Sequence, residues 1–472
     1  MRRGGLLLHP TSLPGPHGIG DAGPAAREVL AFCESAGLRV WQMLPIGPPD
    51  AHGSPYASAS ASAISPSLIS IDDLVADGWL RPDEVVELGH LEVDLETVHR
   101  HKAPMVALAA SRVARSIDLD KFASRQPWTR TWAQWVTLAE AYATDWTRWE
   151  DGLRHRDADA LAALPEGPQG AAIAVQWLLH EQWQHLIAEA RSRGVALWGD
   201  LPILSEADGA DVWERQDLWR LDAAGRPSVV SGVPPDAFTP KGQRWGHPLP
   251  HMAAHEAEGW ATLRARRDLA LSRFDAVRID HFRGFCGLWE VPGDAPDARS
   301  GRWGAGLGDG ALTAIVAGEP QRWIAEDLGV ITPDVIALRD RHGLPGMVVL
   351  QFGFDEGSEH HPSRHRKHQV VYTGTHDNDT TAGWLTSLDA EGRRRVAAIA
   401  GHATVDDVVE MAWQALPDTA IVPVQDLLGL GSEARLNVPG QTRGNWRWRL
   451  PRRALDGPLA QRVRDSLGRA GR

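Results

Sequence analysis

The sequence contains very little cysteine. Cys33 and Cys286 are the only two thiols among its 472 residues. Two thiols are too few for a disulfide framework, and they match no metal-ligand spacing. Because structural disulfides belong to oxidising compartments, this scarcity favours a reducing compartment.

Positive charge is also in short supply. The 49 Lys and Arg residues are outnumbered by 61 Asp and Glu residues, which gives a formal net charge of −12 at pH 7. A protein that binds a phosphate backbone normally presents an excess of Lys and Arg. The charge balance therefore excludes nucleic acid as a partner.

Long apolar runs are missing as well. The run that follows Arg2 and Arg3 covers only residues 6–8, which is shorter than the ~7–15 residues of a signal-peptide core. No later run approaches the ~20 residues that a membrane-spanning helix needs. We therefore predict a soluble, cytoplasmic protein with no membrane partner.

Among the aromatic residues, tyrosine is rare and tryptophan abundant, with 3 and 21 copies. Indole rings stack well on the C–H faces of sugars, but tryptophan is also a common core residue. We expect most of the tryptophans to be structural. One group is predicted to pack helices, with a surface site for sugar as the alternative: Trp128, Trp132, Trp135, Trp146 and Trp149.

Short apolar or β-branched runs alternate along the chain with longer helical patterns, and several of these runs end in Asp, Glu, His, Gly or Pro. Such endings are typical of strands that lead into functional loops. Eight runs with helical spacers predict an α/β fold, the (β/α)8 barrel. The predicted strands are residues 5–9, 39–45, 195–203, 274–282, 322–329, 346–352, 369–377 and 419–426.

The spacers between these strands are uneven. Residues 47–193 are far longer than one crossover helix and carry helical periodicity, which predicts a mainly helical insertion between the second and third strands. Residues 204–251 and 283–310 are rich in Gly and Trp and predict loop insertions over the barrel mouth, after the third and fourth strands. Residues 1–472 then form a single barrel.

The segment at 274–284, FDAVRIDHFRG, carries the most informative pattern. Alternation along a strand sends Arg278 and Asp280 to the same face. A cation beside a carboxylate lowers its pKa and keeps it ionised, as a glycosidase nucleophile requires. The alternative is a structural Arg–Asp pair in the barrel core, which is the commoner outcome for an isolated pattern of this kind.

Two further strands end in acidic residues. Glu326 and Asp327 close the run RWIAEDLG, where burial and neighbouring negative charge would raise the pKa of a general acid. His376 and Asp377 begin a polar cluster, with a polar turn or a cation site as the alternatives. Three carboxylates at the ends of three barrel strands fit retaining glycoside chemistry, in which two carboxyl groups lie ~5 Å apart.

Together these segments resemble the amylomaltases, or 4-α-glucanotransferases, which are relatives of the α-amylases. The resemblance covers nearly the whole chain, because many long motifs occur in the family's order. They include GGLLLHPTSLPGPHGIGD (4–21), WQMLPIGPPDAHGSPYAS (41–58), GDLPI (199–203), ADVW (210–213), VPPD (233–236), GQRWG (242–246), RIDHFRG (278–284), AEDLG (325–329), YTGTHDNDTTAGW (372–384), NVPG (437–440) and NWRWR (445–449).

The resemblance implies a role for each carboxylate. Asp280 would be the nucleophile, Glu326 the general acid/base and Asp377 the carboxylate that stabilises the transition state through sugar hydroxyls. The implied substrates are α-1,4-glucans, namely maltooligosaccharides and chains derived from starch or glycogen, with no metal or other cofactor. The implied substrate-binding residues are Ser54, Tyr56, Asp200, Gln243, Trp245, Arg278, Asp327, His376 and Asn437.

The resemblance also implies a catalytic barrel with inserted subdomains and no C-terminal β-sandwich. The stretch after residue 426 agrees, because it is shorter than the ~100 residues of such a sandwich. The chain departs from the family pattern near the expected sugar sites, which bears on its acceptor and chain-length preference. The departures are Ser65, Gly209, Ala237, His247 and the segment HHPSRHRKH at 360–368.

The implied reaction is a double displacement through a covalent glucosyl-enzyme intermediate, in which a second sugar replaces water as the acceptor. Two alternatives stay open at this point. A retaining α-glucan hydrolase would use the same residues, since only the acceptor differs. A non-catalytic glucan-binding protein would keep the barrel without the turnover.

Overall fold

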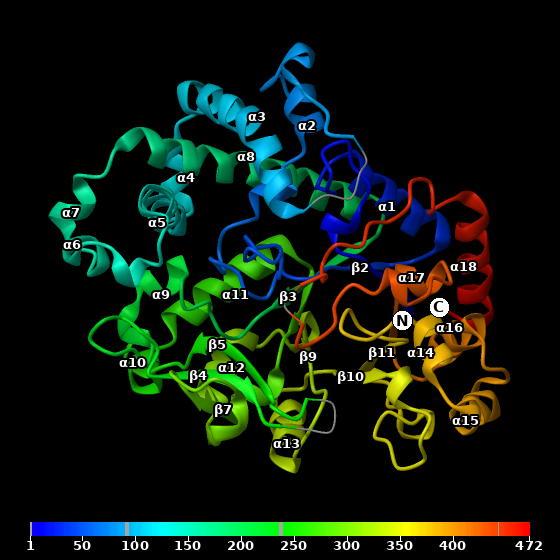
Figure 1. The fold of residues 1–472 in the computed structure, drawn as a ribbon. Helices are drawn as coiled ribbons and strands as arrows, with labels where there is room; N and C mark the ends of the chain where they lie inside the picture. Colours follow the sequence, from blue (N-terminus) through cyan, green and yellow to red (C-terminus); the bar gives the residue numbers. More distant parts are fainter. Residues whose placement is uncertain (1, 90–93, 236–238, 442) are drawn as a thin grey trace.

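The eight predicted strands form one parallel sheet that makes the barrel (Figure 1). The computed structural model describes residues 2–89, 94–235, 239–441 and 443–472. The strand order is β10-β11-β12-β1-β2-β3-β6-β9, and the barrel closes where the backbone N–H of Ala325 donates to the Pro345 carbonyl at 2.9 Å. The predicted (β/α)8 barrel is thereby confirmed. Its strands are β1 (Arg3–Leu7), β2 (Val40–Gln42), β3 (Ala196–Leu201), β6 (Ala276–Ile279), β9 (Trp323–Ala325), β10 (Gly346–Val349), β11 (Gln369–Tyr372) and β12 (Thr419–Pro423).

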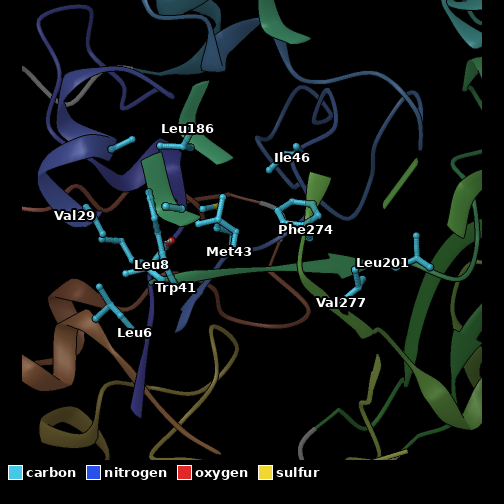
Figure 2. Packing of buried hydrophobic residues seen from close by; sticks show 14 of the residues in the cluster. Leu6, Leu8, Val29, Trp41, Met43, Ile46, Leu186, Leu201, Phe274 and Val277 are labelled. Carbon is cyan, nitrogen blue, oxygen red and sulfur yellow. Dashed lines mark hydrogen bonds between the residues drawn. The ribbon is translucent and has the colours of Figure 1, made fainter. Parts of the chain in front are cut away.

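Successive residues of each strand face opposite sides of the barrel wall. On β6, Val277 and Ile279 pack outward with the large core cluster, whereas Ala276 belongs to the separate cluster inside the barrel. Figure 2 shows part of the outer cluster, with Leu8 and Met43 next to Trp41 and with Val277 of β6 beside Leu201 of β3. Burying a large apolar side chain of this kind contributes about 1.5–3 kcal/mol. This packing fixes which strand residues are left to point inward.

Helices cover the outside of the barrel. The first of them ends at Gly37, whose φ of 76° is a left-handed conformation that glycine adopts without a Cβ clash. This turn redirects the chain into β2. The covering helices are α1 (Pro24–Ala36), α11 (Ala261–Arg273), α12 (Gly308–Val316), α13 (Pro333–Arg341), α14 (Thr381–Ser387), α15 (Ala390–Ala400), α16 (Val405–Gln414), α17 (Val424–Leu427) and α18 (Gly457–Ala470).

Between β2 and β3 the described chain is mainly helical. Asp94 and Asp118 cap two of these helices by accepting hydrogen bonds from the backbone N–H groups of Thr97 at 2.8 Å and Lys121 at 3.0 Å. No helix among the described residues is both long and apolar enough to cross a membrane. The helices are α2 (Ile71–Ala76), α3 (Leu95–Ser116), α4 (Leu119–Arg125), α5 (Trp128–Tyr142), α6 (Asp151–Arg154), α7 (Ala158–Ala162) and α8 (Glu166–Ser192).

Four tryptophans of this helical region behave as its packing residues. Trp146 and Trp149 are buried in one cluster, and Trp132 is buried in another, where its ring stacks on Trp135 at 5.5 Å. The prediction that these side chains pack helices is confirmed. Trp128 is partly buried against the same cluster as Trp132, and it also lines a pocket.

The two segments expected as loops contain strands that pair with each other. Residues 204–251 supply β4 (Val229–Val233) and β5 (Gln243–Pro248), and residues 283–310 supply β7 (Gly287–Pro292) and β8 (Arg302–Ala305). They form an antiparallel sheet in the order β5-β4-β7-β8. The Gly-rich composition hid these strands, and the pairing of β4 with β7 joins two segments that are distant in the sequence. The same region holds α9 (Ala210–Glu214) and α10 (Met252–Ala257).

Candidate active site

The predicted catalytic carboxylates follow the carboxyl ends of barrel strands. Asp280 comes directly after β6, Glu326 directly after β9 and Asp377 in the loop after β11. Asp200 lies within β3, and the β3–β6 register places it opposite Arg278. Barrel enzymes carry their active sites at this end of the strands.

Arg278 connects the acidic residues of the site. Its Nη1 lies 2.7 Å from Asp200 Oδ2 and 2.9 Å from Asp280 Oδ1, and its Nη2 lies 4.0 Å from Glu326 Oε2. The Arg278 side chain is 5% exposed and that of Asp200 is fully buried, whereas Asp280 is 28% exposed. Asp280 is therefore the most exposed member of this cluster, and Glu326 follows at 12%.

Asp200 is held on two sides. Tyr56 donates its hydroxyl to Asp200 Oδ2 at 2.7 Å, and Arg278 contacts both carboxylate oxygens. Burial raises the pKa of the Asp200 carboxyl, while Arg278 and Tyr56 act in the opposite direction. Although burial lowers the pKa of Arg278, the two adjacent aspartates raise it well above its ordinary value. Arg278 is thus a permanent cation in the barrel interior.

Glu326 is held by the main chain. Its Oε2 accepts from the backbone N–H of His281 at 2.7 Å, and its Oε1 accepts from that of Leu328 at 3.1 Å. Burial raises the pKa of Glu326 to about 8, with Asp280 and Asp327 acting in the same direction and Arg278 against them. Glu326 therefore keeps its proton at neutral pH, as predicted for a general acid.

Asp377 is the most exposed of the three carboxylates, with a side chain that is 45% accessible. Asn437 donates Nδ2–H to Asp377 Oδ1 at 2.6 Å, and His376 Nε2 lies 3.4 Å from the same oxygen. Burial lowers the pKa of His376, which keeps its imidazole neutral at neutral pH. Asn437 and His376, both neutral, therefore orient the Asp377 carboxylate, which remains accessible to solvent.

An aromatic group lies beside Asp377. The rings of Tyr56 and His376 stack with centroids 5.1 Å apart, and Trp446 lies 6.1 Å from Tyr56 and 6.0 Å from His376. Trp446 has a φ of 64°, a strained value for a bulky residue. Our sequence reasoning did not single out Trp446, although the NWRWR motif that contains it was a usable signal.

The GQRW segment also reaches the site. Trp245 on β5 packs edge-on against His281, the residue after Asp280, with centroids 4.8 Å apart. Its Nε1–H donates to Gln243 Oε1 at 3.2 Å. Ser54 lies in the loop of Tyr56, where its backbone N–H donates to Asp50 at 2.8 Å. The structure thus places Trp245 against the residue that follows Asp280, and Gln243 against Trp245.

Asp327 does not suit the sugar contact that the resemblance implied. Its Oδ1 accepts from the backbone N–H of Met347 at 2.7 Å, and its Oδ2 is paired with Arg339. The side chain is only 6% exposed. Alternation along β9 turns Glu326 inward and therefore turns Asp327 outward, where it joins β9 to β10. These contacts favour a structural role for Asp327, which we propose in place of the sugar contact.

The departures from the family pattern have different surroundings. His247 lies near Asp280, shares a hydrogen bond with the Ser231 hydroxyl at 3.2 Å, and has a pKa that burial lowers to about 4.

The other departures lie elsewhere. Ser65 is buried and accepts a hydrogen bond from the Ser67 N–H, and Gly209 precedes α9. Ala237 lies outside the described residues. In the segment 360–368, the ring nitrogens of three histidines bond to backbone groups of Val349, His360 and Gly343.

Among the described residues, no group of three or more His, Cys, Asp or Glu side chains is arranged to hold a metal ion. The site combines the Asp280 carboxylate, which Arg278 holds, with the protonated carboxyl group of Glu326. Its third member is the exposed carboxylate of Asp377. On a (β/α)8 barrel, this arrangement defines an enzyme that cleaves and forms glycosidic bonds with paired carboxyl groups.

Comparisons with known proteins narrow this class. The model of the 4-alpha-glucanotransferase family matches residues 8–455. The chloroplastic/amyloplastic 4-alpha-glucanotransferase of Arabidopsis thaliana is 42% identical, over 100% of this chain and 86% of its own length. The 4-alpha-glucanotransferase of Thermus thermophilus is 43% identical over 94% of each chain. The solved amylomaltase from Streptococcus agalactiae in complex with acarbose superposes with a TM-score of 0.96 at 28% identity, covering 100% of both chains.

The chain belongs to the 4-alpha-glucanotransferase family. The resemblance read from the sequence motifs is thereby confirmed, and the protein is an enzyme of glycosyl transfer.

Proposed function

We propose that this enzyme transfers segments of α-1,4-glucan between maltooligosaccharides by a retaining double displacement. In the first step Asp280 attacks the anomeric carbon of the donor while Glu326 gives its proton to the glycosidic oxygen of the leaving sugar. The C–O bond to the leaving sugar breaks, and a β-linked glucosyl-enzyme ester forms. In the second step Glu326 takes the proton of an acceptor 4-hydroxyl, whose oxygen displaces Asp280 and restores the α-linkage.

One observation carries this assignment. Arg278 contacts Asp280 at 2.9 Å and approaches Glu326 at 4.0 Å, while Glu326 keeps a proton because its pKa is raised to about 8. A nucleophile must be ionised and an acid must be protonated at the same pH, and this environment separates the two states. Oδ1 of Asp280 is engaged by Arg278, which leaves Oδ2 as the attacking oxygen.

The third carboxylate has a role that fits its exposure. Asp377 is oriented by Asn437 at 2.6 Å and remains 45% exposed. A fixed carboxylate at this position would hydrogen-bond the hydroxyls of the reacting glucose and strengthen those bonds as positive charge develops on the ring. The stacked Tyr56 and His376 would flank the same sugar.

We further propose that the chain works as one catalytic barrel, with residues 47–193, 204–251 and 283–310 framing the substrate cleft. A cytoplasmic location is part of the same proposal. The two free thiols, Cys33 and Cys286, support a reducing compartment.

Incubation with maltotriose tests the reaction. Transfer produces glucose together with a ladder of longer maltodextrins, because the glucosyl-enzyme is captured by another sugar. The rival function, a retaining α-glucan hydrolase, would convert maltotriose into glucose and maltose alone. That product pattern would overturn the proposal while leaving the roles of Asp280 and Glu326 intact.

A further inference from the structure

A second pocket lies apart from the predicted catalytic residues. It has a cavity volume of about 570 Å³ and lies between α9, α10 and α11 of the barrel side and the beginning of α5 (Figure 1). None of Asp280, Glu326 and Asp377 is among its lining residues. This volume falls within the ~300–1,000 Å³ that small-molecule sites normally offer. We call it the α10–α11 pocket.

Four aromatic side chains line part of the pocket: Trp128 and Trp260 are partly exposed, whereas Trp219 and His255 are buried behind them. His255 stacks on Trp260 with centroids 6.0 Å apart, and Trp219 meets His255 edge-on at 6.1 Å. Trp128 lines the pocket from the helical insertion. Indole rings offer flat apolar faces to the axial C–H groups of a sugar and a polar N–H at their edge. An aromatic wall of this kind suits a ring-shaped ligand that has both apolar and polar surfaces.

The pocket also contains hydrogen-bonding groups with unused capacity. The indole N–H of Trp219 and the Nε–H of Arg266 are buried and have no hydrogen-bond acceptor among the described residues. Asp211 accepts from the Ala61 N–H at 2.7 Å and Glu214 from the Thr131 hydroxyl at 2.5 Å, so both carboxylates keep further lone pairs. A buried donor without an acceptor costs free energy, which a hydroxyl-rich ligand would relieve.

The charges of the pocket nearly balance, since three arginines line it together with four carboxylates. Glu258 is paired with Arg215 at 2.7 Å, and the buried Asp211 and Arg266 influence each other electrostatically. A pocket for phosphate would hold an excess of cations, and one for an ammonium group would hold unpaired carboxylates. Matched charges with aromatic faces and mixed donors and acceptors favour a neutral polyhydroxylated ligand.

We propose that the α10–α11 pocket is an accessory binding site for a short segment of α-glucan, an inference that rests on the proposed function for the choice of sugar. The site is built where the helical insertion meets the barrel, since Trp128 comes from one and Trp260 from the other. Ser205 and Leu204 in its wall follow Asp200 of β3 closely along the chain. We expect a long glucan to occupy this pocket and the catalytic cleft together, and maltotriose to occupy only one of them.

Kinetics with substrates of two lengths test this site. Loss of one stacking contact in Trp260→Ala is expected to raise the ratio of the KM for amylose to the KM for maltotriose by about five-fold. Trp219→Phe replaces the indole by a phenyl ring and so removes the N–H. It should raise the same ratio to a smaller extent. The matched control is Trp303→Ala, because Trp303 is 44% exposed and lies on β8 outside the pocket. An unchanged ratio in folded Trp260→Ala protein would overturn the proposal.

A crystal structure of Asp280→Asn with maltoheptaose separates this proposal from the proposed function. Sugar in the α10–α11 pocket supports the accessory site, whether or not the parent enzyme disproportionates maltotriose. Sugar in the catalytic cleft with an empty pocket refutes the accessory site and leaves the proposed function standing. Trp260→Ala should abolish the sugar in the pocket and retain the sugar in the cleft.

Discussion

Asp200 and Asp280 contact the same nitrogen of a third residue, Nη1 of Arg278, at 2.7 and 2.9 Å. One aspartate is fully buried and the other is 28% exposed. The buried carboxylate therefore fixes the guanidinium in place, and the guanidinium presents the exposed carboxylate to the cleft. The predictions below follow from this arrangement and from the groups around it.

Asp280→Asn is expected to lower kcat by at least about 10³-fold, because an amide cannot form the covalent intermediate. The affinity for maltotriose, measured by calorimetry, should change little, since Asp280 is one contact among many. Asp294→Asn is the matched control, because Asp294 is exposed in the loop after β7. Full activity in Asp280→Asn would contradict the assigned nucleophile.

The pH dependence of kcat/KM should report the proton of Glu326. Because the pKa of Glu326 is raised to about 8, the acid form is present at neutral pH and is lost above that value. We expect kcat/KM to fall about tenfold per pH unit above pH 8. Burial lowers the pKa of His247 and His281 to about 4, so neither should produce a limb between pH 5 and 7. A kcat/KM that stays constant from pH 7 to pH 10 would contradict this account.

Glu326→Gln should stabilise the protein at high pH while it removes activity. The carboxyl pKa is 4.5 in its ordinary state and about 8 in the folded enzyme. Between these values the folded chain holds a proton that the unfolded chain has released, so Glu326 costs more folding free energy as the pH rises from 4.5 to 8. We expect Glu326→Gln to gain on the order of 1–3 kcal/mol over the parent at pH 8 and little at pH 4.5, measured by urea unfolding. An equal gain at both pH values would contradict the raised pKa.

Removing Arg278 should lower the stability of the folded enzyme as well as inactivate it. Arg278→Leu leaves Asp200 buried beside Tyr56 without its cation, which is expected to cost about 3–5 kcal/mol of stability. The double variant Arg278→Leu/Asp200→Leu should recover most of that loss in denaturant unfolding, without recovering kcat. As a control, Arg299→Leu breaks an exposed pair with Asp297 and should cost less than about 1 kcal/mol.

Asp377 and Asn437 should act together. Asp377→Asn is expected to reduce kcat by about 10²–10³-fold, the usual effect of losing one fixed group that stabilises a transition state. Asn437→Ala removes the 2.6 Å hydrogen bond that orients Asp377 and should have a smaller effect in the same direction. In the double variant, the effect of Asn437→Ala should vanish. Fully additive effects in the kinetic cycle would show that Asn437 acts independently of Asp377.

The barrel strands were predictable because their signal is local. On β6, alternation alone places Arg278 and Asp280 on the inner face, and the contacts of Arg278 with Asp200 and Asp280 agree with it. The same rule, applied to β9, would have shown that Glu326 and Asp327 cannot both face inward. The sugar contact implied for Asp327 rests on the family resemblance alone, whereas the outward direction of the side chain favours a structural role.

The antiparallel sheet β5-β4-β7-β8 could not be predicted from local alternation in the sequence. β4 pairs with β7, a strand from the other segment that was expected to be a loop. Nothing in the composition of either segment indicates its partner, because the pairing depends on where the barrel places the two insertions. The same holds for Trp446, which meets Tyr56 and His376 only in the folded chain.

The backbone of His281 has a further consequence. Its φ of 50° ends β6 immediately after Asp280 and directs its N–H to Glu326 at 2.7 Å, while the N–H of Phe282 donates to the Glu326 carbonyl at 3.1 Å. Backbone groups of residues 281 and 282 therefore help to hold Glu326 beside the nucleophile. Engineering of the surrounding cleft can change which sugars enter while the distance that defines the chemistry is inherited unchanged.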